Sequence, residues 1–245
     1  MEAIYKMNLN ELNDLALGAA KEAGDFLNQS KLEKKEVYKE EGRDIKLIID
    51  RDAEKLIRAR LLKTTIPVLG EEYGGEIIDK RYWVIDPIDG TANYFRGLDN
   101  CCISIALVDG DDCVLGVIYN FNNDQMYSAM KGKGAFLNDK KIKVSKIDEK
   151  SKASITTGFP ASESIESSMN FLNGLVGWKK VRMFGSAALS CAYVASGKCD
   201  YYSEKGVYLW DFAAGICLVK EAGGHAEYCL IDENRYEVVF SNGLL

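Results

Sequence analysis

Histidine is almost absent from this chain of 245 residues, which contains only His225. A catalytic mechanism of the Ser-His-Asp or Cys-His type would have to use that side chain, and zinc sites built from several histidines are excluded. His225 follows two glycines, and we expect it to be structural or exposed. The chemistry is therefore left to carboxylates, hydroxyls, lysines or backbone groups.

Paired cysteines and long apolar runs are also missing. The seven cysteines form no C-x-x-C pair, and most have apolar neighbours, among which Cys behaves as a small hydrophobe. No apolar run approaches the ~20 residues needed to cross a bilayer, and the first residues are too polar for a signal peptide. We expect a cytoplasmic protein in a reducing compartment, with no disulfide framework and no membrane partner.

The charge balance is mildly acidic, with 31 Lys and Arg against 37 Asp and Glu. This balance argues against broad nucleic-acid binding through phosphate neutralisation, and we expect no nucleic-acid partner. It does not exclude a small anionic substrate, because a bound metal can reverse the local field. With 47% hydrophobic residues, the chain can bury a sizeable core.

The hydrophobic pattern changes near residue 150, between two halves that we expect to form one compact unit. Residues 1–150 predict an antiparallel sheet with two helices, and residues 151–245 alternate strands and helices as α/β structures do. The charged stretch 31–44 predicts a solvated loop or a short exposed hairpin. The other expected elements are helices at 8–29, 50–66, 163–176, 186–196 and 210–222, and strands at 82–86, 101–108, 113–120, 125–130, 134–144, 153–158, 181–184, 199–204, 225–230 and 236–240, with turns at 131–133 and 138–140.

The clearest chemical motif is Asp-Pro-Ile-Asp-Gly-Thr at residues 86–91. An apolar strand ends in Asp86 and Asp89, and two carboxylates brought together repel each other and favour a divalent cation. Gly90 can adopt positive φ and admit a ligand close to the backbone. Thr91 begins an expected helix, whose first N–H groups would suit a phosphate. The alternative is an ordinary Asx turn with a helix cap, and the motif alone does not decide between them.

Other acidic residues have equally simple explanations when each is considered alone. Glu71 and Glu72 could be solvated surface charges, or metal ligands at the carboxyl end of a strand. Asp211 lies in the first turn of an apolar helix, where a favourable interaction with the helix dipole suffices. Asp50 could cap a helix. The Lys-Gly-Lys-Gly sequence at 131–134 lacks the frame of a phosphate-binding loop and predicts a turn.

Taken in order, these motifs resemble the inositol monophosphatase family. They are G-E-E at 70–72, D-P-I-D-G-T-x-N at 86–93 and W-D-x-A-A-G at 210–215, and the resemblance covers nearly the whole chain. It implies an α/β (α+β) fold, a layered αβαβα sandwich with the active site between the sheets. It also implies a Mg²⁺-dependent phosphoric monoester hydrolase that attacks inositol monophosphate, or a related small polyol or sugar phosphate, with metal-activated water.

The resemblance implies the metal ligands as well. Glu71, Asp86 and the carbonyl oxygen of Ile88 would hold one Mg²⁺. Asp86, Asp89 and Asp211 would hold a second, and Glu71 would help with a third through water. These are the oxygen ligands that hard cations prefer, and Mn²⁺ could substitute for Mg²⁺.

Catalysis and substrate binding follow from the same resemblance. Thr91, coupled to Asp50, would help Glu71 and the metals to activate the attacking water. The chain departs from the family pattern at 46–49, which lacks a hydroxyl, and at Tyr73, where a serine is common. Both departures concern the positioning of water rather than the metal ligands. The residues expected to contact the substrate are Asp89, Gly90, Thr91, Gly185, Ser186, Ala187 and Glu204.

Several alternatives remain open at this stage. The same chemistry could act on fructose-1,6-bisphosphate, histidinol phosphate or a nucleoside 3′,5′-bisphosphate, with Glu204, Arg182 and residues 31–44 deciding among them. A phosphate-ligand binding protein that keeps the fold without turnover is a further alternative. The family resemblance also suggests a homodimer and, in some members, inhibition by lithium. The apolar strand at 101–108 could serve an interface or the core.

Overall fold

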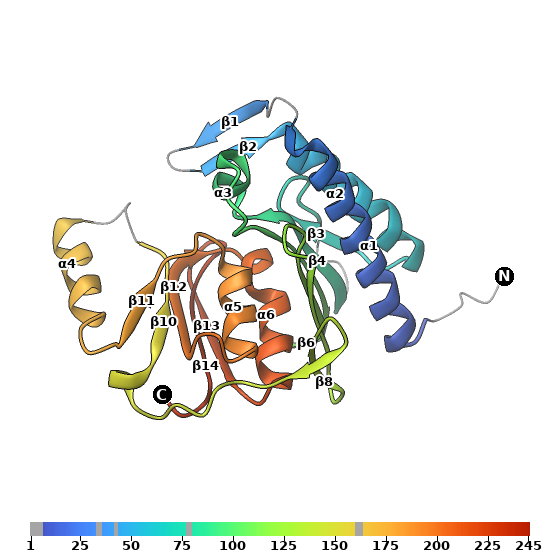
Figure 1. Cartoon of the computed structure of the whole chain (residues 1–245). Helices are drawn as coiled ribbons and strands as arrows, with labels where there is room; N and C mark the ends of the chain where they lie inside the picture. Colours follow the sequence, from blue (N-terminus) through green and yellow to red (C-terminus); the bar gives the residue numbers. More distant parts are fainter. Residues whose placement is uncertain (1–6, 33–35, 42–43, 77–79, 160–163) are drawn as a thin grey trace.

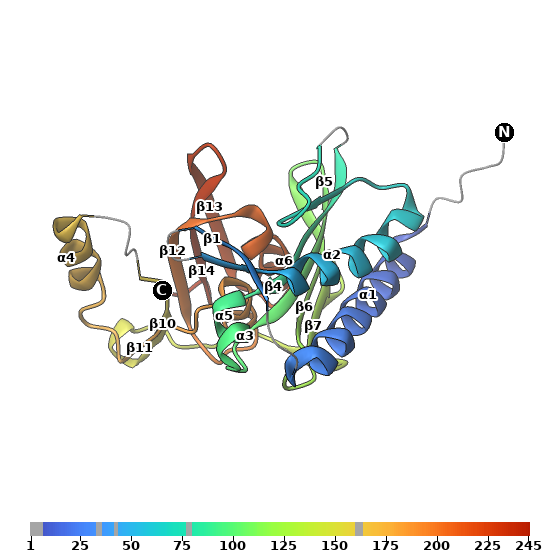
Figure 2. The ribbon, with the colours of Figure 1, turned by 90° about the horizontal axis from the view of Figure 1, so that it is seen from above.

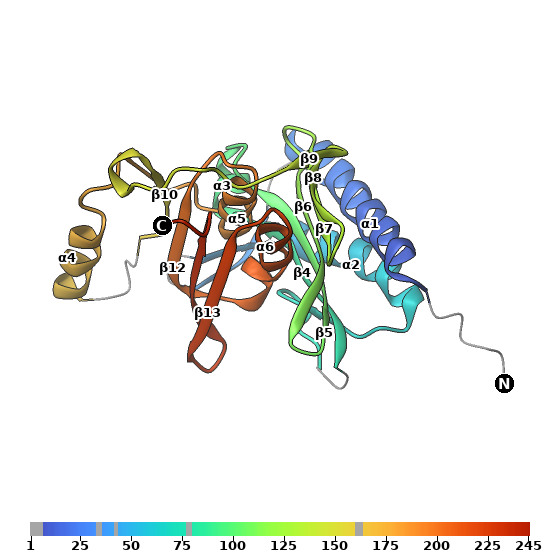
Figure 3. The same ribbon diagram turned by 90° about the horizontal axis from the view of Figure 1, so that it is seen from below.

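The computed structural model describes residues 7–32, 36–41, 44–76, 80–159 and 164–245. Its helices and sheets are stacked in layers (Figures 1 and 3). The helices α1 (Leu9–Gln29) and α2 (Ile48–Leu61) cover one face of a seven-stranded sheet. The helices α5 (Ala187–Ala195) and α6 (Leu209–Glu221) lie between that sheet and a five-stranded one, and α4 (Ile165–Gly174) lies beyond it. The expected αβαβα order is therefore confirmed.

The seven-stranded sheet is formed by a segment of the first half of the chain. Its strands follow the order β3-β4-β5-β6-β7-β8-β9, and all pairs are antiparallel except β3 with β4. The expectation of a purely antiparallel sheet is wrong at that pair, because the chain after β3 returns to the end where β3 begins. The strands are β3 (Val68–Gly70), β4 (Arg81–Asp89), β5 (Cys102–Asp109), β6 (Asp112–Asn120), β7 (Gln125–Met130), β8 (Gly134–Leu137) and β9 (Lys140–Ile142).

The five-stranded sheet has the order β11-β10-β12-β14-β13. β10 is parallel to both of its neighbours, and the remaining pairs are antiparallel. Its strands are β10 (Ser154–Thr156), β11 (Lys180–Arg182), β12 (Tyr201–Val207), β13 (His225–Asp232) and β14 (Arg235–Ser241).

Smaller elements close the end of the molecule where β4 stops. The short helix α3 (Thr91–Arg96) follows β4 directly. A hairpin of β1 (Val37–Glu41) and β2 (Asp44–Leu47) lies beside α3 (Figure 2). The hairpin alternative for 31–44 therefore holds where the chain is described, and 33–35 and 42–43 lie outside the described residues. Within the described part of the chain there are also three 3-10 turns, at Ser30–Leu32, Leu62–Thr64 and Lys150–Lys152.

The turn expected at 138–140 within the strand-like run 134–144 is confirmed: it joins β8 to β9, and Asn138 and Asp139 both adopt positive φ. Other predicted elements differ from the structure in their bounds. The strand expected to end at Asp86 continues to Asp89, because a register shift opposite β5 accommodates the missing N–H of Pro87. The helix expected at 50–66 ends at Leu61 and continues only as a 3-10 turn.

Successive side chains of β4 point to opposite faces of the sheet and belong to two hydrophobic cores, one on each face. Trp83 and Ile85 pack with the residues of α1 and α2, whereas Val84 packs with those of α5 and α6. The apolar strand at 101–108 is buried within these cores. Gly116 of β6 lets α6 approach closely, since a Cβ there would lie 2.3 Å from the Ala214 carbonyl oxygen.

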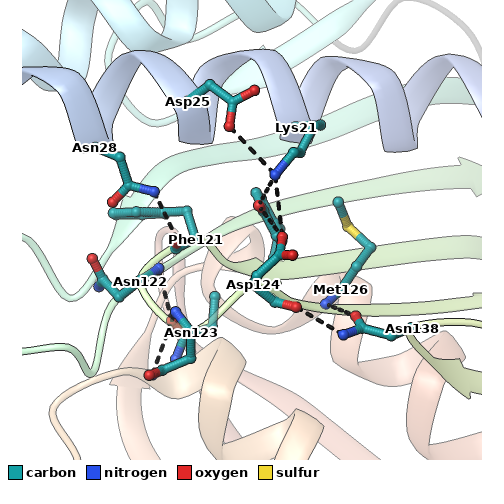
Figure 4. A network of polar contacts seen from close by, with 11 residues as sticks. Lys21, Asp25, Asn28, Phe121, Asn122, Asn123, Asp124, Met126 and Asn138 are labelled. Atoms are coloured by element: carbon teal, nitrogen blue, oxygen red, sulfur yellow. Dashed lines mark hydrogen bonds and ion pairs between the residues drawn. The ribbon is translucent and has the colours of Figure 1, made fainter.

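A polar network fastens α1 to the turn after β6 (Figure 4). The Lys21 ammonium contacts Asp124 at 3.1 Å and Asp25 at 3.4 Å, and the amide of Asn28 donates to the Phe121 carbonyl at 2.7 Å. The Asn138 amide donates to the carbonyl of Asp124 and so joins the β8–β9 turn to the same place. The exposed ion pairs are worth little singly, and the network sets the position of α1 on the sheet.

The Lys-Gly-Lys-Gly sequence at 131–134 is the predicted turn. The backbone N–H groups of Gly132 and Gly134 donate to the Glu221 carboxylate at 2.8 and 2.7 Å. The turn therefore binds the end of α6. Within the described ranges, no helix has both the length and the apolar character that crossing a membrane requires.

Candidate active site

Three aspartates that are distant in sequence meet between the two sheets. Asp86 and Asp89 come from the end of β4, and Asp211 comes from the first turn of α6. Each offers a carboxylate oxygen, and these oxygens all lie within 4.8 Å of one another. Asp86 is 2% exposed and Asp89 7% exposed. The predicted meeting of these carboxylates is present in the structure.

The simple local explanations for two of these residues are also correct. The Asp86 carboxylate accepts from the N–H of Ile88 at 2.9 Å, as in an Asx turn. The Asp211 carboxylate accepts from the N–H of Tyr208 at 2.7 Å, as a residue of a helix cap does. Local capping and clustering are therefore compatible, because the cap itself fixes the direction of each side chain.

Asp89 is held by the start of α5. The N–H of Ala188 donates to its Oδ2 at 2.7 Å, the N–H of Ala187 donates to its Oδ1 at 3.3 Å, and the hydroxyl of Ser186 also donates to Oδ2. The thiol of Cys102 lies 3.7 Å from the same oxygen. A carboxylate is favourable at a helix N-terminus, so the second half of the chain positions an acid of the first half.

Burial and mutual repulsion raise the pKa values of the whole cluster. Burial is the largest cause for Asp86 and Asp211, and the neighbouring carboxylates, including Glu71, raise both pKa values further. Burial raises the pKa of Asp89 to about 6, although its bonds to Ser186, Ala188 and Ala187 oppose the shift. Clustered oxygen donors that are costly to ionise without a counter-charge fit a divalent cation.

Glu71 completes this acidic cluster. It begins the turn that follows β3, and its side chain hydrogen-bonds to that of Asp86. Asp50 lies in the first turn of α2 and accepts from the N–H of Leu47 at 2.7 Å, which confirms its capping role. The Thr91 hydroxyl donates to the carbonyl of Ile88 at 2.9 Å. The coupling of Thr91 to Asp50 stays a prediction.

Gly90 permits a close approach of the two halves. Its φ is +92°, and a Cβ there would lie 2.9 Å from the Asn100 carbonyl oxygen and 3.0 Å from that of Gly185. The amide of Asn93 donates to the carbonyls of Asn100 and Phe184, both at 2.7 Å. These contacts bring the 184–187 segment against the end of β4.

Glu204 lies near the cluster at the other side of α5. Burial raises its pKa to about 7, and the charge of Asp89 contributes to the shift. The hydroxyl of Tyr202 donates to its Oε2 at 3.0 Å, and the backbone N–H of Gly158 is a further partner. A Cβ at position 158 would lie 1.9 Å from Oε1, so only glycine leaves room for this carboxylate. Sequence reasoning missed Gly158, because nothing local marks this residue.

Two residues singled out in the sequence lie away from the cluster. Arg182 is an exposed residue of β11 whose carbonyl accepts from the N–H of Thr157. His225 is exposed at the start of β13 and lies 2.7 Å from Glu227, as expected of a structural or exposed residue.

Comparisons with known proteins agree with this fold. A family model described as the inositol monophosphatase family matches residues 8–241. The chain is 38% identical over 220 residues to the Nus factor SuhB of Xylella fastidiosa, which covers 86% of this chain and 80% of that protein. It is 39% identical over 186 residues to the inositol-1-monophosphatase of Rhizobium meliloti, which covers 71% of this chain and 68% of that one. The crystal structure of the extragenic suppressor protein suhB from Bartonella henselae superposes with a TM-score of 0.88 at 32% identity, covering 94% of each chain.

The fold, the acidic cluster and these matches define a phosphatase, a hydrolase of phosphoric monoesters. The chain belongs to the inositol monophosphatase family. Family members depend on metals, in agreement with the oxygen donors of the cluster.

The titration of Glu204 should be visible in the stability of the metal-free protein. Its pKa is raised from 4.5 to about 7 in the folded state, so the stability that proton binding contributes is complete below about pH 4.5 and lost as the pH rises through about 7. Glu204→Gln removes this loss. From about pH 5 to about pH 8, its free energy of unfolding should improve over the wild type by on the order of 2–3 kcal/mol.

Urea unfolding in the presence of a chelator measures this difference at each pH. The exposed Glu233→Gln variant serves as the control and should run parallel to the wild type. A Glu204→Gln curve that also runs parallel to the wild type would contradict the buried, proton-binding state of Glu204.

Proposed function

We propose that this phosphatase hydrolyses inositol monophosphate, or a related small polyol or sugar phosphate, with Mg²⁺ as its cofactor. The observation that supports the proposal is the group formed by the buried carboxylates of Asp86 and Asp89 and the half-buried one of Asp211, with Glu71 beside Asp86. A phosphate monoester dianion would not approach such a group unless cations covered its charge. Hard oxygen donors of this kind favour Mg²⁺, and Mn²⁺ would fit the same donors.

The family resemblance supports two main cation positions. Glu71, Asp86 and the carbonyl of Ile88 would hold one cation, and Asp86, Asp89 and Asp211 would hold the other, with Glu71 also serving a third through water. When bound, such cations neutralise phosphate charge, lower the pKa of water and stabilise the leaving oxygen. This division of labour needs no histidine, which suits a chain whose histidine is exposed at the far edge of the second sheet.

The residues of the chain would orient the other reactants. Thr91 and Asp50, with Glu71, would position the attacking water. The backbone at Gly90 and Thr91 would bind the phosphate. The remaining contacts, to the hydroxyls of the substrate, are assigned to Asp89, Gly185, Ser186, Ala187 and Glu204.

Glu204 favours a polyol over a second phosphate at the far end of the substrate. Its carboxylate is half-buried and fixed by Tyr202 and Gly158, and its raised pKa lets it donate or accept near neutral pH. Hydroxyl groups can use both modes, whereas an additional phosphate would meet an acid in a poorly solvated place. For this reason, fructose-1,6-bisphosphate and nucleoside 3′,5′-bisphosphates are less suited to this site.

The cation ligands are tested by Asp89→Asn. The amide keeps the size of the side chain but removes a charged ligand. We expect Mg²⁺-stimulated phosphate release to fall by on the order of 10³-fold or more. The measurement is the steady-state rate with saturating Mg²⁺, together with the circular dichroism spectrum. The exposed Asp148→Asn variant should keep full activity, and equal turnover by both variants would refute the assignment.

Substrate class is tested by a panel of phosphate esters, assayed with and without Mg²⁺. Inositol monophosphates should rank above fructose-1,6-bisphosphate, histidinol phosphate and a nucleoside 3′,5′-bisphosphate in kcat/KM. The ranking should depend on Glu204, because Glu204→Gln removes an acceptor for hydroxyls. A bisphosphate at the head of the ranking would overturn the polyol preference, and no Mg²⁺ stimulation with any ester would overturn the whole proposal.

We further propose a cytoplasmic homodimer that pairs through α4. All seven cysteines are free thiols, as a reducing compartment would maintain them. Among the ten residues of α4, all of them described, none is buried. Ile165, Met169 and Leu172 are exposed at helical spacing, and Val176 continues the row. A short helix is marginal alone, and a second copy would cover this self-complementary row on both partners at once.

A charge placed in that row should separate the copies. Met169→Glu should shift the protein from dimer to monomer at micromolar concentrations, because a carboxylate would be buried without a partner. Sedimentation equilibrium gives the mass. Asn170→Glu adds the same charge to the same helix outside the row and should leave the dimer intact. A monomeric wild type, or a dimer that tolerates Met169→Glu, would exclude this arrangement.

A further inference from the structure

The turn that carries Glu71 is held from behind by α2. A buried acid, Glu54, occupies the middle of that helix and is 0% exposed. Its Oε2 accepts from the N–H of Glu72 at 2.8 Å, and its Oε1 accepts from the N–H of Tyr73 at 3.2 Å. The two N–H groups immediately after Glu71 are therefore bound by one carboxylate.

Arg58 binds the same turn through its carbonyls. Its Nε donates to Glu54 at 2.7 Å, its Nη1 donates to the carbonyl of Val68 at 3.1 Å, and its Nη2 donates to the carbonyl of Gly74. The planar guanidinium thus joins the strand before Glu71 to the residue after the turn. Glu54 and Arg58, one helical turn apart, satisfy four backbone groups on either side of the acid.

A glycine at position 70 allows Glu54 to pack closely against this turn. A Cβ at Gly70 would lie 2.2 Å from the Oε1 of Glu54, so the carboxylate sits directly against the backbone that precedes Glu71. The N–H of Gly70 donates to the carbonyl of Gly74 at 3.0 Å, which closes the turn on itself. The N–H of Glu71 donates to the carbonyl of Ile85 at 3.3 Å, next to Asp86.

The geometry points to Glu54 and Arg58 as positioning residues for the metal ligand Glu71. Neither residue belongs to the acidic cluster itself. Together they fix the backbone from Val68 to Gly74, so the Glu71 carboxylate is oriented toward Asp86 before a cation arrives. This preorganisation matters because Glu71 and Asp86 repel each other once both are ionised, and a loose turn would then let Glu71 swing away.

The inference rests on the proposed function and is tested by metal binding rather than by activity alone. Glu54→Gln keeps the shape of the side chain, but one N–H of the turn would face an amide NH₂. Arg58→Lys keeps the charge beside Glu54 but cannot reach the carbonyls of Val68 and Gly74 together. Each variant should weaken Mg²⁺ binding, measured by isothermal titration calorimetry, by ~10–100-fold. The rate at saturating Mg²⁺ should change less than the dissociation constant.

The matched control is Ile57→Val on the same helix, a fully buried residue outside the turn network. It should lower the urea midpoint and leave the Mg²⁺ dissociation constant unchanged, because it alters packing only. Arg58→Lys decides the question if Glu54→Gln does not fold. Folded variants that bind Mg²⁺ as the wild type does would overturn the positioning role while the proposed function stands. A wild type with neither Mg²⁺ binding nor Mg²⁺-stimulated hydrolysis would overturn the proposed function itself.

Discussion

The repulsion among four carboxylates brought together between the two sheets is the constraint on which the rest of this structure depends. Burial raises the pKa values of Asp86, Asp89 and Asp211, and the charge of Glu71 raises those of Asp86 and Asp211 further, so these acids would separate if they were free to do so. Each is instead attached to an element that cannot easily move. The folding energy of two sheets and the helices between them keeps these acids together, and a cation is the natural counter-charge.

The three aspartates are held mainly by backbone N–H groups rather than by opposing charges. Tyr208 and Ile88 supply one N–H each to Asp211 and Asp86, and the start of α5 supplies two to Asp89. Neutral donors fix the direction of a carboxylate without cancelling its charge. An arginine in the same place would compete with a metal, so this choice preserves the cation affinity of the site.

Much of this arrangement could be predicted from the sequence, for identifiable reasons. Asp86 and Asp89 are marked by a strand followed by Pro and Gly, and Asp211 by the start of an apolar helix. The turn at 138–140 was marked by Asn and Asp between two strand-like runs, whereas the parallel pairing of β3 with β4 was not predictable, because it depends on the return path of the chain. The partners that support the site, such as Glu54 behind Glu71, belong to elements distant in sequence, and only the packing reveals them.

The contact between Gly116 and Ala214 has a consequence for the distance between the two halves of the site. Ala214 lies one helical turn after Asp211, and its carbonyl rests where the side chain of residue 116 would otherwise be. The depth at which α6 meets the sheet is therefore set by main-chain atoms, which have no rotamers to exchange. The spacing of Asp211 from the carboxylates of β4 is thereby insulated from fluctuations of the surrounding core. Gly116, which is not part of the acidic cluster, therefore sets how far Asp211 lies from the carboxylates of β4.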